Sequence, residues 1–151
     1  MFDHKDILLH WVNRLSLLSR ADLSDRFKAA GFKITTEEWA LMLVLWQNGP
    51  LTPSALAQAT FKDRTTVTRL TDGMVRKGMV QRRNDDQDRR RVLIEVTQHG
   101  AALRDQLVPI AEAMIADRLS GIPADDLAVT RRTLKTLTHA FETNGADDDR
   151  L

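Results

Sequence analysis

Arginine and threonine side chains gather in one short segment, in a pattern suited to hydrogen bonding with phosphates and with the edges of nucleic-acid bases. The spacing of Val67, Leu70 and Met74 predicts a helix over residues 64–77 with these side chains turned inward. The polar residues near its N-terminal end then face outward: Arg64, Thr65, Thr66, Thr68 and Arg69. Arginine donates two hydrogen bonds to guanine, and threonine meets phosphate or a thymine methyl group. An ordinary amphipathic helix has the same pattern, so this helix alone leaves both interpretations open.

A second cluster of arginines follows at the tip of a predicted β-hairpin. Residues 79–83 and 92–96 are rich in strand-forming side chains, and the polar residues between them predict the connecting turn. The tip carries three consecutive arginines, Arg89, Arg90 and Arg91. Since one structural partner cannot neutralise all of them, at least one is free to enter a narrow minor groove. Asp88 is placed to orient a neighbouring arginine by a charge-assisted hydrogen bond. The alternative is a surface ribbon whose charges pair internally.

Charge is unevenly distributed along the chain. The net charge of the whole protein is +1, yet ten basic and only five acidic residues lie between Lys62 and Arg91. A basic central segment in a chain whose other residues are acidic overall is typical of a protein with one surface that binds phosphates. Charge alone, however, favours chance clustering on a solvated surface.

Length and composition limit the remaining possibilities. The chain has 151 residues, enough for one domain with appended helices, and no cysteine, which excludes disulfides and thiolate metal sites. The first residues lack the order of a secretory signal, and the longest apolar run, Trp39 to Trp46, is too short to cross a bilayer. We therefore expect a cytoplasmic protein with no membrane contact.

Periodicity and turn signals predict a mainly α fold with a small β-hairpin. Helices are expected over residues 6–29, from a capping box at Thr35 and Glu38 to residue 48, and from Thr52 to about residue 60. After the hairpin, helical spacing returns from Thr97, breaks at residues 121–123 and resumes to the C-terminal region. The helix containing residues 39–46 is apolar on every side, so we expect other elements to cover it all round.

The motifs in this region resemble the MarR family of bacterial winged-helix transcriptional regulators. The resemblance is strong from about residue 35 to residue 100 and includes an Asp-x-Arg motif at Asp88 and Arg90 and a closing Val-Thr-x-x-Gly run that ends at Gly100. It implies a winged helix-turn-helix over residues 33–100 and a helical dimerisation region made of residues 1–32 and 101–145. The polar ending of the sequence itself predicts a disordered tail at residues 146–151.

Family likeness also implies partners. It predicts a homodimer that binds double-stranded DNA at a palindromic operator, usually as a repressor, with Arg90 in the minor groove and Asp88 orienting it. In such regulators a small molecule, often an aromatic acid, or an oxidant loosens the DNA complex. The cysteine-based oxidant response is excluded here because the chain has no cysteine.

A ligand pocket could lie between the dimer helices and the DNA-binding lobe, where it would change the spacing of the two recognition helices. Tryptophans and polar neighbours that could line it are His10, Trp11, Arg14, Trp39 and Trp46. The alternative for each tryptophan is a plain core position.

Three other functions are weaker alternatives. A metal-responsive regulator would need clustered ligands, yet none of the four histidines stands three or four residues from another. No enzyme, catalytic residue or cofactor is predicted, because the chain lacks a phosphate-binding glycine loop and a nucleophile elbow. A winged helix that serves only protein contacts would differ from a DNA reader in the salt dependence of binding.

Overall fold

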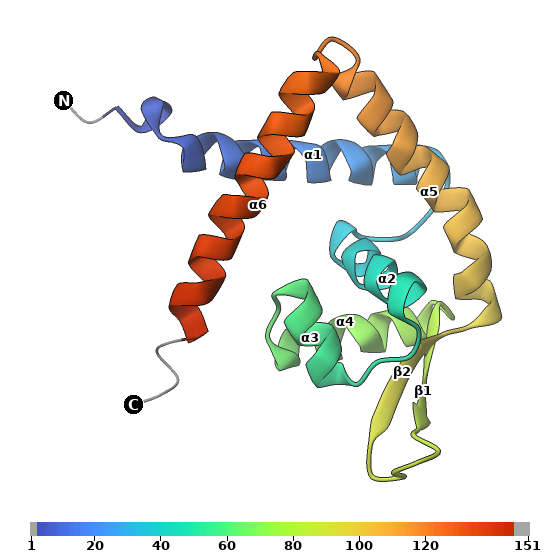
Figure 1. Ribbon diagram of the computed structural model, residues 1–151. Helices are drawn as coiled ribbons and strands as arrows, with labels where there is room; N and C mark the ends of the chain where they lie inside the picture. Colours follow the sequence, from blue (N-terminus) through green and yellow to red (C-terminus); the bar gives the residue numbers. More distant parts are fainter. Residues whose placement is uncertain (1–2, 147–151) are drawn as a thin grey trace. The chain divides into compact units, whose positions relative to one another are not determined.

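The computed structural model describes residues 3–146 and has the mainly helical fold with one antiparallel hairpin that the sequence predicts (Figure 1). A 3-10 turn, His4–Asp6, precedes the first helix. The elements are, in order, α1 Leu8–Ala29, α2 Thr36–Asn48, α3 Pro53–Thr60, α4 Arg64–Arg76, β1 Val80–Asn84, β2 Val92–Val96, α5 Gln98–Leu119 and α6 Ala124–Ala146.

The chain divides into two compact units, Met1–Met114 and Ile115–Leu151. The first unit holds α1 to α4, the hairpin and most of α5, and the second holds the end of α5 and α6. The division into a dimerisation region and a DNA-binding domain remains a prediction. Of the predicted tail, Ala146 is the last residue of α6, and residues 147–151 lie outside the described part of the chain.

Side-chain caps begin α2 and α3 where the sequence predicts them. Thr35 and Glu38 form a reciprocal capping box at α2, and Thr52 caps α3 with Pro53 in its first turn. The start of α1 differs from the predicted residue 6: α1 begins at Leu8 without a side-chain cap, and Asp3 caps the 3-10 turn that precedes it.

One core holds the first unit together. It contains fully buried side chains from α1, α2, α3, α4, β2 and α5, among them Phe27, Leu41, Met42, Leu56, Val67, Met74, Ile94 and Leu107. The expectation that other elements cover α2 on all sides is wrong for the single chain, since 42% of Leu43 is exposed. Among residues 3–146, no helix combines the length and the apolar character that a membrane-spanning segment needs.

The hairpin is anchored at its base and free at its tip. Val80 pairs with Val96 and Asn84 with Val92, and Leu51 adds a bridge to Ile94 through backbone hydrogen bonds of 2.8 and 3.1 Å. This bridge ties the hairpin to the segment between α2 and α3, so the residues beyond Asn84 project as a wing (Figure 1).

A tight junction joins the wing to α5. The Thr97 hydroxyl donates to Gly78 O at 2.5 Å and accepts from Gly100 N at 3.0 Å, and Gly100 O accepts from Trp46 Nε1 at 3.0 Å. A Cβ on Gly100 would lie 2.0 Å from the carbonyl oxygen of Met79. Only glycine therefore allows α5 to approach the wing this closely.

Phe61 is the one described non-glycine residue with positive φ, 54°, at the turn between α3 and α4, and its side chain is 80% exposed. The left-handed conformation costs an ordinary residue about 1 kcal/mol. We expect Phe61→Gly to raise the free energy of unfolding by about 0.5–1 kcal/mol, measured by urea denaturation, because it removes that cost and exposes little apolar surface. Phe61→Ala keeps the Cβ and should bring no gain; an equal gain from both variants would show that the backbone conformation is not the cause.

Candidate nucleic-acid interface

Helix α4 begins with an engaged carboxylate. Asp63 Oδ1 accepts from Thr66 N at 2.7 Å, and Asp63 Oδ2 accepts from the Thr66 hydroxyl at 2.9 Å. The hydrogen bond from the Thr66 backbone, reinforced by its hydroxyl, holds the pKa of the Asp63 carboxyl below its usual value. The Thr66 side chain is half-buried, and its hydroxyl proton is used in the bond to Asp63. Its hydroxyl oxygen can still accept a hydrogen bond.

The other predicted α4 residues form an exposed polar face. Arg64, Thr65, Thr68 and Arg69 are all exposed, whereas Val67, Leu70 and Met74 are buried as predicted. The Thr68 hydroxyl donates to Arg64 O at 2.9 Å, which leaves its oxygen as an acceptor and its methyl group outward-accessible. Thr65 has no hydrogen bond from its side chain within residues 3–146 and is free to act as donor or acceptor.

Glu37 is a functional neighbour that the sequence analysis missed. It lies in the first turn of α2, and its Oε2 is 3.7 Å from Lys62 Nζ and 4.0 Å from Arg69 Nη2. The side chain of Arg69 is nevertheless 67% exposed. Glu37 thus holds two cations beside the outer face of α4, of which Arg69 stays exposed and Lys62 is half-buried.

Two of the arginines in the basic segment are bound within the fold. Arg83 Nε donates to Glu95 Oε2 at 2.6 Å across the hairpin, and Arg82 Nη2 donates to Asp72 Oδ1 at 2.5 Å, joining β1 to α4. The hydrogen bond from Arg83, with a second from Gln81, lowers the pKa of Glu95, and Glu95 raises the pKa of Arg83. These pairs orient the wing against α4, so part of the segment's positive charge is structural.

At the wing tip the three consecutive arginines differ. Arg91 Nη1 lies 3.8 Å from Asp85, which is on the other arm of the hairpin. Asp88 Oδ1 accepts from Arg90 N at 3.1 Å and lies 3.4 Å from Arg90 Nε, while the Arg90 side chain stays 94% exposed. Arg89 has no ion pair within the described chain. The tip thus offers Arg89 and Arg90 to a partner, with Arg90 oriented by Asp88.

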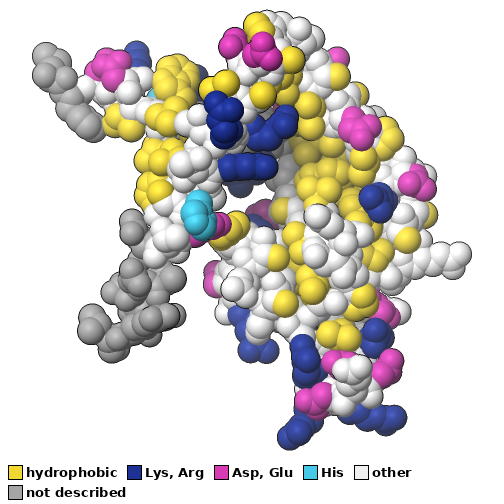
Figure 2. Space-filling model, in the orientation of Figure 1, with side chains coloured by type: hydrophobic (Ala, Val, Ile, Leu, Met, Phe, Trp, Pro, Cys, Tyr) yellow, Lys and Arg dark blue, Asp and Glu magenta, His cyan; other side chains and the backbone are white. Residues whose placement is uncertain are grey.

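A hollow of about 370 Å³ brings the recognition elements together. It is lined by residues at the start of α3, at the start of α4 and at the end of the wing: Thr52, Pro53, Ser54, Arg64, Arg90, Arg91 and Val92. Figure 2 shows basic side chains, with acidic ones among them, where Figure 1 places the hairpin. Arg64 and Arg90, 26 positions apart in sequence, therefore face one space that suits a phosphate group.

The five predicted ligand residues fall into two groups. Trp39 and Trp46 contact each other, with ring centroids 5.7 Å apart, and Trp39 also contacts the buried Phe27. His10 and Trp11 contact each other near the start of α1, where Arg14 is exposed. The hollows of the first unit described here are lined by other residues, and the ligand role of all five stays a prediction. Within residues 3–146, no three His, Asp or Glu side chains are grouped as metal ligands would be.

Comparisons of the sequence with protein families and with known proteins agree with each other. A sequence profile of the MarR family matches residues 34–92, which run from the α1–α2 loop to the first residue of β2. Over 144 aligned residues the chain is 30% identical to the transcriptional repressor MprA of Escherichia coli strain K12, and the match covers 90% of this chain and 80% of MprA.

Solved structures show the same fold. A mutant MarR from E. coli in complex with operator DNA is similar with a TM-score of 0.79 at 23% identity, over 86% of this chain and 92% of that one. BpsR of Bordetella bronchiseptica, whose DNA binding is regulated by 6-hydroxynicotinic acid, is similar with a TM-score of 0.81 at 20% identity, over 91% of this chain and 97% of that one.

Proposed function

Because the chain belongs to the MarR family of transcriptional regulators, we propose that it is a homodimeric, sequence-specific DNA-binding repressor in the cytoplasm. The observation that carries the proposal is the shared hollow: Arg64 of α4 and Arg90 of the wing face the same space, so one DNA backbone can meet both elements. A duplex offers neighbouring grooves to a helix and a ribbon placed in this way.

In the proposed complex, α4 enters the major groove with its N-terminal end foremost. Arg69 and Thr68 read base edges there, while Arg64, Thr65 and Thr66 lie close to phosphates. Arg90, exposed and oriented by Asp88, enters the adjacent minor groove, and Arg89 binds the neighbouring phosphate.

Dimerisation is supported by apolar side chains that the single chain leaves uncovered. Leu8, Trp11, Leu15 and Leu18 recur at helical spacing on α1 and are between 52% and 66% exposed. None of the described side chains of α6 is buried, although Val129 and Phe141 are large and apolar. A contiguous apolar stripe like the one on α1 is rarely left exposed in a monomeric protein. A second copy of the chain that covers it would also supply the second recognition helix that a palindrome requires.

The proposal also includes a small effector, such as an aromatic acid, that releases the protein from DNA. BpsR, a structural relative, is regulated by an acid of this kind. To release the protein from DNA, such a molecule need only bind the free conformation more tightly than the DNA-bound conformation. The alternatives, a metal-responsive regulator or a winged helix for protein contacts only, lack an observation that favours them.

Substitutions of Arg69 and Arg90 test this function. We expect Arg90→Ala to weaken binding to a selected operator by about tenfold or more, a loss similar to that of one base contact. Arg69→Ala should relax the preference for one base. Fluorescence anisotropy with a labelled duplex at several salt concentrations measures both effects.

The matched control is Arg104→Ala, which removes one exposed positive charge from α5. It should leave operator affinity nearly unchanged. Equal weakening by Arg90→Ala and Arg104→Ala would contradict the wing assignment. Binding that does not weaken as salt rises would favour a protein partner instead of DNA, because DNA binding releases counterions.

A further inference from the structure

The two arginines in the N-terminal half of α4 have different surroundings. Glu37 Oε2 lies 4.0 Å from Arg69 Nη2, whereas the Arg64 side chain forms no ion pair and no hydrogen bond with any residue in the range 3–146. Arg64 faces the hollow that suits a phosphate, and Arg69 is the residue proposed to read a base edge. The carboxylate therefore lies beside the base-reading arginine and not beside the phosphate-binding one.

The wing has the same arrangement. Asp88 Oδ1 lies 3.4 Å from Nε of Arg90, the arginine proposed to enter the minor groove. Arg89, which is proposed to bind a phosphate, has no ion pair within the described chain. In both elements a carboxylate accompanies the arginine that is directed at bases. The relation of Glu37 to α4 is therefore that of Asp88 to the wing.

A carboxylate beside an arginine changes which group of DNA the arginine prefers. A guanidinium can bind a phosphate or the edge of a guanine with the same pair of donors. Phosphate is an anion, so a neighbouring carboxylate repels it and partly neutralises the positive charge that attracts it. A base edge is neutral and loses less. Glu37 is thus expected to disfavour phosphate contacts of Arg69 more than base contacts.

The geometry leaves Arg69 available while Glu37 stays close to it. The separation of 4.0 Å is longer than a hydrogen bond, and 67% of the Arg69 side chain is exposed, so its donors remain open to a base. The same oxygen of Glu37 lies 3.7 Å from Lys62 Nζ, a second cation that would otherwise attract phosphate. Exposed pairs of this kind add little to folding stability, so their loss should affect DNA binding and not the fold.

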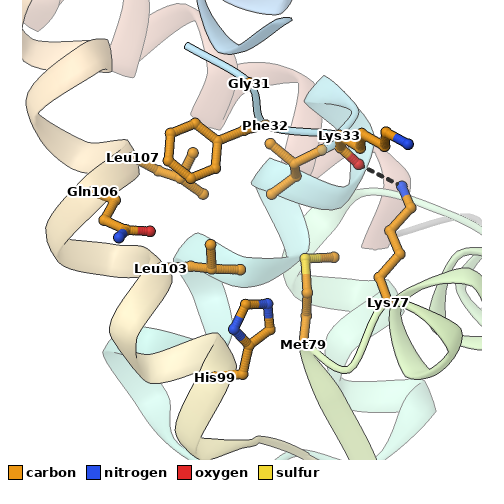
Figure 3. A pocket seen from close by; sticks show the side chains of 10 residues that line it. Gly31, Phe32, Lys33, Lys77, Met79, His99, Leu103, Gln106 and Leu107 are labelled. Atoms are coloured by element: carbon orange, nitrogen blue, oxygen red, sulfur yellow. Dashed lines mark hydrogen bonds between the residues drawn. The ribbon is translucent and has the colours of Figure 1, made fainter.

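The adjacent carboxylate, Glu38, has a separate structural role. It is 3% exposed and accepts a hydrogen bond from Lys77 Nζ at 2.7 Å, which joins the first turn of α2 to the C-cap of α4. Lys77 Nζ also donates to Lys33 O at 2.7 Å, beside the cavity shown in Figure 3. These bonds hold the start of α2 against α4, so the backbone of Glu37 has a fixed place beside the recognition helix.

We propose that Glu37 is a specificity-determining residue that keeps Arg69 from phosphates and so reserves it for a base. This inference rests on the proposed function, because it concerns DNA binding by α4. Glu37 lowers the affinity for duplexes of any sequence and preserves the affinity for the operator, so the ratio of the two affinities rises. That ratio decides how the protein distributes itself between its operator and the many competing sites.

The test compares full-length Glu37→Gln with the wild type on two duplexes of equal length, a selected operator and its scrambled sequence. Fluorescence anisotropy at several salt concentrations measures both affinities. Glu37→Gln should bind the scrambled duplex about fivefold more tightly and the operator with little change, so the affinity ratio falls by about fivefold. Salt dependence on the scrambled duplex should steepen by about one released counterion, because Arg69 then binds a phosphate.

Glu112→Gln is the matched control, since it makes the same change at an exposed position on α5 that has no ion pair in the described chain. It should leave the affinity ratio unchanged. If Glu37→Gln tightened binding equally on both duplexes, the residue would act only through net charge, and the proposal would be overturned.

A second measurement shows whether Glu37 acts through Arg69. Each base pair of the operator half-site is replaced in turn, and the position at which Arg69→Ala loses its preference is identified. Glu37→Gln should weaken discrimination at that same position and should have little further effect in the Arg69→Ala background. Weaker discrimination at every position, or an undiminished effect in the Arg69→Ala background, would also overturn the proposal.

Failure of the proposed function gives a different result. A wild type that enriches no duplex would contradict that function and this inference with it. A wild type that selects an operator, together with a Glu37→Gln variant of unchanged affinity ratio, would contradict the role of Glu37 alone.

Discussion

Gly100→Ala is expected to lower the free energy of unfolding by about 3 kcal/mol and to disrupt the contact between the wing and α5. The added Cβ would lie 2.0 Å from Met79 O and 2.9 Å from Val96 Cγ1. Because the nearest of these atoms is backbone, no side-chain rotation relieves the overlap. The strand and the helix must separate, and the hydrogen bond from Trp46 to Gly100 O is lost with them.

Urea unfolding followed by tryptophan fluorescence measures this loss, with Trp46 reporting on the junction itself. Gly73→Ala is the matched control, since Gly73 is also helical but its Cβ would meet only ordinary contacts of 3.7 and 3.9 Å. That variant should gain about 0.5–1 kcal/mol from the higher helix propensity of alanine. A stable Gly100→Ala protein with an unchanged fluorescence spectrum would refute the close approach.

The second large effect is expected at the dimer surface. Leu15 is 66% exposed in the single chain and lies in the middle of the apolar stripe on α1. Leu15→Glu would bury an unpaired charge in the proposed interface, at a cost of several kcal/mol, so dimer dissociation should become about 100-fold easier or more. Operator affinity should fall with it, because a single subunit binds only one half-site.

Sedimentation velocity across a range of concentrations measures the dimer, and circular dichroism verifies that the monomer is folded. Asn13→Glu is the control: it adds the same charge at an exposed position on the opposite side of α1 from Leu15. It should leave the dimer intact. A Leu15→Glu protein that remains dimeric would place the interface elsewhere.

Local features of this fold could be predicted from the sequence because each depends on a few neighbouring residues. Thr35 and Thr52 cap the helices that the sequence predicts to begin there, and Gly78, just after α4, has the positive φ, 73°, of a helix-ending glycine. The hairpin also follows from local propensity, although β1 begins one residue later than predicted, at Val80. Helix and strand periods are enough for such predictions.

Long-range contacts of the candidate site could not be predicted in the same way. The ion pairs of Glu37 with Arg69 and of Asp72 with Arg82 join residues far apart in sequence, and no spacing rule identifies them. The cavity lined by Phe32 and Leu107 likewise combines the α1–α2 loop with α5. The exposure of Leu43 has another cause: an apolar helix indicates that something covers it, but periodicity cannot say whether the cover is the same chain or a second copy.

Selection of bound duplexes from a random DNA pool tests the central claim most directly. If paired α4 helices and wings read one duplex, the wild type should enrich a palindrome with half-sites about 10 base pairs apart, and Arg90→Ala should bind it weakly. Equal affinity for all duplexes and for heparin, with no sequence enriched, would contradict the account.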